Sequence, residues 1–72
     1  MVSYKVIIER DEEEQCYVAS VPALPGCRTQ GKTREETLER VKEAIQGYLE
    51  SLQKDGISIP KDVELEEVAV PV

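Results

Sequence analysis

The sequence predicts a two-layer α+β domain in which one amphipathic helix packs on a mostly antiparallel sheet, in the order β-β-β-α-β. Three observations lead to this fold class: alternating apolar residues near the N-terminus, a turn-rich stretch after them, and a long helical period in the second half. The chain has 72 residues, so we expect one domain spanning residues 1–72. A domain of this size buries only about 60% of the surface of its unfolded chain. Self-association is therefore an expected further source of stability.

Two strands are expected first, at residues 3–10 ("SYKVIIER") and 16–21 ("CYVASV"). The short acidic turn between them favours antiparallel pairing. Alternation assigns one set of side chains to a common face of this hairpin: Tyr4, Val6, Ile8, Tyr17, Ala19 and Val21. The opposite face would then expose Ile7, Val18 or the valines that close the sequence, and an uncovered apolar face usually binds a partner or a second copy.

The stretch "VPALPGCRTQGKT", residues 21–33, has no periodicity and must end the second strand. Pro22 and Pro25 have no N–H to give to a strand ladder, and Gly26 can adopt positive φ. Within it, residues 27–32 ("CRTQGK") are weakly strand-like and could return as a third strand.

The strongest signal in the chain is a helix that begins after Thr33. Thr33 and Glu36 form the spacing of a capping box. The apolar residues that follow recur at spacings of three and four: Leu38, Val41, Ile45, Tyr48 and Leu52. Gly47 lies inside this helix, where we expect it to allow close packing on the sheet. Lys54, Asp55 and Gly56 end the helix.

A last strand is expected at residues 63–72, "VELEEVAVPV", because Val68, Val70 and Val72 alternate. Pro71 near its end favours a position at the edge of the sheet.

The net charge of −6, from 15 acidic and 9 basic side chains, disfavours direct binding of nucleic acid, since phosphates would be repelled. A basic protein is a better partner for such a chain. The alternative is that the charge only keeps the protein in solution. No apolar run is long enough for a membrane span and the N-terminus does not resemble a secretory leader, so a cytoplasmic protein with reduced thiols is expected.

No catalytic residue, metal site or cofactor is expected. Cys16 and Cys27 lack a His that could act as a base, so we interpret both as small buried apolar residues. Four adjacent carboxylates could bind a metal ion, but their spacing is not that of a calcium loop. A solvated turn, or a docking patch for a basic protein, is the better interpretation of these residues: Asp11, Glu12, Glu13 and Glu14.

The stretch "GCRTQGKT" formally matches a phosphate-binding loop, from Gly26 to Thr33. A chain of 72 residues cannot supply the large nucleotide-binding sheet, and the second strand belongs to a hairpin, so we interpret the match as accidental. Arg28, Lys32 and Arg34 could form a basic cluster near the start of the helix.

The chain from Tyr4 to Glu50 resembles the HicB-type antitoxin domain. The matching features are a Tyr-x-Val-x-Ile first strand, an acidic turn, Tyr17-Val18-Ala19, Val21-Pro22-x-Leu24-Pro25-Gly26-Cys27, Gly31-x-Thr33-x-Glu35-Glu36, and a helix containing Ala44-Ile45-x-Gly47-Tyr48-Leu49. We interpret seven of these residues as a structural motif: Pro22, Pro25, Gly26, Cys27, Gly31, Thr33 and Glu36.

This resemblance implies a β-β-β-α-β domain similar to a reduced ribonuclease H fold. It also implies a non-enzymatic protein that neutralises a small basic HicA-type toxin, a ribonuclease that cleaves mRNA, and that forms a dimer or tetramer. Many members carry a further DNA-binding segment after the domain. The sequence ends soon after its expected last strand, so DNA binding by this chain alone is not expected.

Two other functions remain open from the sequence. The first is a stand-alone structural or oligomerisation domain with no toxin partner. The second is a metal-dependent nuclease relic that would use Asp11 and the neighbouring glutamates.

Overall fold

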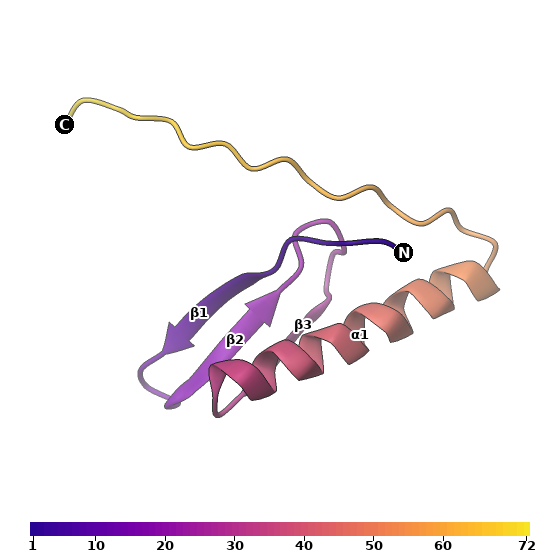
Figure 1. The fold of residues 1–72 in the computed structure, drawn as a ribbon, viewed down its shortest axis with the longest axis horizontal. Coiled ribbons are helices and arrows are strands. Elements are labelled where there is room, and N and C mark those ends of the chain that lie inside the picture. The colour runs from indigo at the N-terminus through magenta and orange to yellow at the C-terminus, as the bar shows by residue number, and fades with distance from the viewer.

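Three strands and one helix make up the regular structure of the computed structural model, which describes residues 1–72 (Figure 1). The strands are β1 (Ile7–Asp11), β2 (Cys16–Ser20) and β3 (Arg28–Gly31), and the helix is α1 (Arg34–Lys54). Their order in the sheet is β1-β2-β3, with both neighbouring pairs antiparallel. The helix crosses one face of the sheet (Figure 1) and contacts mainly β3 and β2. The predicted α+β class is therefore confirmed.

The core lies between α1 and the face of the sheet assigned from the alternation. Ile8 pairs with Ala19 and Arg10 with Tyr17, so the inner side chains of β1 and β2 share one side. Five buried residues form the centre of the core: Ala19, Val21, Leu24, Cys27 and Val41. Tyr4, Val6 and Ile8 pack against them, as the alternation predicts.

The outer face of the sheet is mixed rather than apolar. Ile7 is 42% exposed on this face and Val18 is half-buried. Val18 pairs with Glu9 on one side and Gln30 on the other, so polar residues surround it. This face offers only a weak apolar surface to a partner.

Gly31 and Gly47 have different surroundings. A Cβ on Gly31, at the end of β3, would lie 2.7 Å from Thr37 Oγ1 and 3.1 Å from Thr37 N. Only glycine therefore allows β3 to approach the first turn of α1 this closely. The expectation for Gly47 is wrong, because this residue is exposed and a Cβ there would meet no atom within 4 Å. Gly47 faces solvent and takes no part in packing on the sheet.

The last strand expected at residues 63–72 is absent from the single chain. Residues 57–72 contain no helix or strand, and Figure 1 shows them leaving the body of the molecule above β1. The radius of gyration of 14.2 Å exceeds the roughly 11 Å of a compact chain of this length. We call residues 64–72 the tail.

Side-chain bonds, not a backbone ladder, hold residues 62–63 beside Lys5, which precedes β1. The Lys5 backbone N–H donates to Asp62 Oδ2 over 3.0 Å, and Lys5 Nζ donates to the Val63 carbonyl over 2.7 Å. These side chains occupy two backbone groups that a ladder would use. The Tyr4 hydroxyl also donates to the carbonyl of Pro60.

No helix in the structure has both the length and the apolar character needed to cross a bilayer.

Gly31→Ala should lower the free energy of unfolding by roughly 1–3 kcal/mol, because the added methyl group collides with Thr37. The matched control is Gly47→Ala, which adds the same methyl group in open space and should raise stability by roughly 0.5–1 kcal/mol through helix propensity. Urea unfolding followed by circular dichroism measures both changes. Equal effects of the two substitutions would contradict the close approach of β3 to α1.

The contact between Lys5 and Asp62 should weaken in acid. Partial burial by itself would raise the pKa of the Asp62 carboxyl, but hydrogen bonds from the Lys5 side chain and backbone and from the Val63 N–H lower it below its usual value. A lowered pKa means that the contact is intact at neutral pH and is lost as pH falls below about 4. In an NMR titration the Lys5 amide should shift in this range, and in Asp62→Asn it should not. A midpoint above 4 would show that the carboxyl is not stabilised by these bonds.

Candidate functional site

The loop between β2 and β3 is held by its own backbone. Val21 N–H donates to Cys27 O over 3.0 Å, Leu24 N–H to Val21 O over 3.0 Å, and Cys27 N–H to Leu24 O over 2.9 Å. Gly26 has φ of +81°, which reverses the chain before Cys27. Leu24 is fully buried beneath the loop. Pro22 and Pro25 are exposed at positions where no ladder N–H is needed.

The start of α1 continues this backbone unit. Thr33 Oγ1 accepts a hydrogen bond from Glu36 N over 3.0 Å, the capping interaction that the spacing indicates. The Glu36 carboxylate accepts from Lys32 N over 3.1 Å, one residue before the usual partner in a capping box, and pairs with Arg40 at 2.8 Å. Farther along α1, the Tyr48 hydroxyl donates to Pro25 O over 3.0 Å and ties the helix to the loop.

The phosphate-loop match has no structural basis. Residues 28–31 within it form β3, whose backbone pairs with β2, so these peptide groups cannot wrap around a phosphate.

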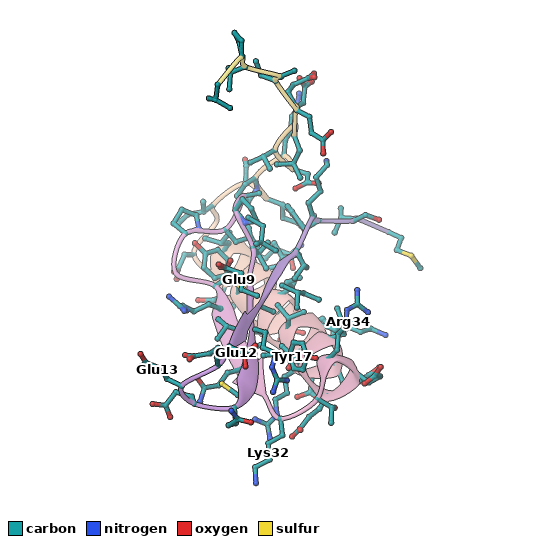
Figure 2. All side chains as sticks on the ribbon, turned by 90° about the vertical axis from the view of Figure 1, so that its left-hand side faces the viewer. Glu9, Glu12, Glu13, Tyr17, Lys32 and Arg34 are labelled. Atoms are coloured by element: carbon teal, nitrogen blue, oxygen red, sulfur yellow. The ribbon has the colours of Figure 1, made fainter.

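The predicted basic cluster is also divided. Arg28 lies opposite Ser20 at the start of β3, whereas Lys32 and Arg34 lie beyond the other end of that strand (Figure 2).

The cysteines are buried free thiols. Cys16 is 7% exposed and Cys27 is 6% exposed. Burial raises the pKa of the Cys27 thiol, which favours the protonated, unreactive form. No group of three or more Cys, Asp or Glu side chains is arranged to hold a metal ion.

The acidic turn between β1 and β2 divides into structural and solvent-facing carboxylates. Asp11 Oδ1 accepts hydrogen bonds from Glu13 N over 3.1 Å and Glu14 N over 3.2 Å, so Asp11 shapes the turn. Glu12 pairs with Arg10 at 3.3 Å, and this guanidinium also lies over the ring of Tyr17.

Two carboxylates of the turn remain without a cationic partner. Glu13 and Glu14 are both exposed and form no ion pair, and Figure 2 shows Glu13 projecting from the tip of the turn. Glu9, an exposed residue of β1, lines a shallow hollow together with Glu13, and Arg28 of β3 lines the same hollow. We call Glu9, Glu13 and Glu14 the acidic patch.

A second surface was not predicted from the sequence. An apolar groove of about 660 Å³ lies between the N-terminal residues and one side of α1. We call it the N-terminal groove, and eight apolar residues line it: Met1, Val2, Tyr4, Val6, Leu38, Val41, Ile45 and Leu49. It exists because α1 covers β3 and β2 and leaves the inner side of the chain before β1 open. The only sequence feature that indicates this groove is that the alternation of apolar residues continues from Tyr4 back to Val2.

Comparison with known proteins identifies the family of this chain. Residues 4–71 match the model of the HicB_like antitoxin of bacterial toxin-antitoxin system. The chain belongs to the HicB-like antitoxin family.

The chain is also similar in sequence to proteins of comparable length. This HicB-like chain is 54% identical to a UPF0150 protein of Thermoplasma acidophilum over 69 residues, which cover 96% of this chain and 97% of that one. It is 53% identical over 49 residues to a UPF0150 protein of Archaeoglobus fulgidus, covering 68% of this chain and 70% of the other.

A solved structure agrees with the fold. The N-terminal domain of the Burkholderia pseudomallei antitoxin HicB is similar to this HicB-like chain with a TM-score of 0.65 and 28% identity, over 89% of this chain and 69% of that one. The resemblance stated from the sequence is therefore confirmed.

Substitutions in the acidic turn of this HicB-like protein should separate its two kinds of carboxylate. Asp11→Ala removes the acceptor of two backbone hydrogen bonds and should lower the free energy of unfolding by roughly 1 kcal/mol. Glu13→Ala, the control, removes only a solvent-facing side chain and should change stability by less than about 0.5 kcal/mol. Urea unfolding measures both values. If Glu13→Ala proves as costly as Asp11→Ala, Glu13 has a structural role in the turn.

Proposed function

We propose that this HicB-like protein binds and neutralises a small basic toxin ribonuclease of the HicA type. Membership of the antitoxin family supports the proposal, and the acidic patch supplies a surface of suitable charge. The protein acts by binding and not as an enzyme. Its site of action is the cytoplasm, where a toxin that cleaves mRNA finds its substrate.

Electrostatics explains how the acidic patch would inhibit such a toxin. A ribonuclease holds RNA largely through basic side chains that contact phosphates. Glu13 and Glu14 project from a turn whose backbone is fixed by Asp11, so their carboxylates are presented without the cost of ordering a flexible loop. Placed against the basic surface of the toxin, these carboxylates would compete with RNA phosphates for the same cations.

The net charge of −6 extends this attraction beyond the contact itself. Opposite net charges on two proteins steer their encounter and raise the association rate, and salt weakens the effect. Asp11 and Glu12 would take part mainly by holding the turn, since their carboxylates already have partners within it.

The other two functions have less support. A metal-dependent nuclease would need several carboxylates that converge on one ion, but Asp11 Oδ1 is used by the turn. A stand-alone structural domain accounts for a fold of this kind but gives no role to the exposed acidic patch.

We also propose that the protein forms a homo-oligomer, a dimer or a tetramer, which acts as the antitoxin.

The experiment is inhibition of RNA cleavage by a HicA-type toxin, sought first in the gene beside the one for this protein. Wild-type protein should suppress cleavage at an equimolar ratio. The variant Glu13→Lys/Glu14→Lys should bind the toxin at least about tenfold more weakly, mainly through slower association that depends less on salt.

The matched control is Glu39→Lys/Glu43→Lys, which makes the same change in charge on the exposed side of α1. This control should keep most of the affinity. Equal loss in both variants would assign binding to net charge and not to the acidic patch. Absence of binding by wild-type protein would overturn the antitoxin proposal and favour the stand-alone domain.

A further inference from the structure

Two apolar surfaces of this chain have no partner within the molecule. One is the N-terminal groove, of about 660 Å³. The other is the tail, where Val68 is 79% exposed and Val70 is 68% exposed. An extended segment with valines at every second position is typical of a strand that packs on one side.

The apolar pattern of the tail region changes phase between Glu66 and Glu67. Val63 and Leu65 share one side of the extended chain, whereas Val68 and the valines after it lie on the other side. Val63 is half-buried against the body of its own chain, close to Lys5. Val63 is therefore the last apolar residue that contacts its own chain, since Leu65 is 60% exposed, and residues 68–72 present their valines on the other side.

Geometry keeps residues 68–72 away from their own groove. The tail and β1 run in the same direction (Figure 1), and Asp62 is held beside Lys5 by two hydrogen bonds of 3.0 Å. A tail paired in step with β1 would place Val68 beside Asp11, the last residue of β1. Val70 and Val72 would then extend past the end of the sheet. The N-terminal groove lies at the opposite end of β1, beside residues 1–6.

We propose that residues 68–72 of one copy occupy the N-terminal groove of a second copy, and that the exchange is reciprocal. The chain carries both the strand and the groove, so two copies related by a two-fold axis satisfy both surfaces at once. The valines would pack between the N-terminal segment and α1, against Val6 and Ile45.

Charge favours the same arrangement. Lys42 is the one charged residue that lines the groove, and Glu66 and Glu67 precede the valines of the tail.

This inference rests on the proposed homo-oligomer and not on toxin binding, so it is tested with the full chain alone. Light scattering after gel filtration should show a dimer of the wild-type protein. Val70→Asp places a charge in the groove and should weaken the dimer at least about tenfold. The matched control Ile57→Asp makes the same change at a side chain that is 53% exposed and outside both surfaces, and it should leave the dimer intact.

Other results would overturn the exchange. A monomeric wild-type protein, or a Val70→Asp variant that dimerises as well as the wild type, is incompatible with it. A third variant, Ile7→Asp, tests the outer face of the sheet as the interface. If Ile7→Asp dissociates the dimer and Val70→Asp does not, the copies join through that face instead.

Cross-linking between two differently labelled copies tests the contact itself. Val70→Cys protein mixed with Gln46→Cys protein should give a mixed dimer with a short bismaleimide, because Gln46 lines the groove. Wild-type protein should react little, since its own thiols are buried. A dimer that persists in solution but forms no Val70–Gln46 cross-link between copies would overturn the proposal. Toxin inhibition is absent from these assays, so their failure leaves the antitoxin proposal to its own test.

Discussion

The close approach of β3 to the first turn of α1 determines the arrangement of the whole domain. Gly31 admits Thr37 at a distance that no side chain at position 31 would allow, and Thr37 is fully buried there. Thr37 Oγ1 then donates to Thr33 O over 2.7 Å, while Thr33 caps the helix. With its start fixed in this way and Tyr48 bonded to Pro25, α1 must lie over β3 and β2.

That placement explains where the two candidate interaction surfaces are found. Because α1 lies toward β3, the inner side of the N-terminal segment stays open and forms the N-terminal groove. The acidic turn lies at the opposite end of β1, where Asp11 fixes its backbone and leaves Glu13 directed into solvent (Figure 2). The two surfaces therefore lie at opposite ends of β1.

Much of the fold could be predicted because its signals are local. The alternation of apolar residues correctly predicted which side chains of the first two strands face α1, and the spacing of Thr33 and Glu36 located the start of that helix. The prediction of a fourth strand at residues 63–72 was wrong for a physical reason. Alternating valines indicate that a segment packs on one side, but they do not indicate which sheet it joins, and the bonds between Lys5 and Asp62 are long-range features that no local pattern shows.

The N-terminal groove was missed because it depends on the lateral position of α1. In the acidic turn the sequence indicated four equivalent carboxylates, and only the structure distinguishes Asp11 from Glu13.

Hydrogen exchange, measured by mass spectrometry with and without the toxin, tests most directly the claim that separate surfaces serve the two interactions. Residues 68–72 should be protected in the protein alone, because a second copy covers them, and toxin should not change this. Residues 12–14, in the exposed turn between β1 and β2, should exchange faster than the paired strand β2 in the protein alone and become protected when toxin binds. Toxin-induced protection of residues 68–72 with no change at 12–14 would contradict the account, since the tail and not the acidic turn would then be the toxin-binding surface.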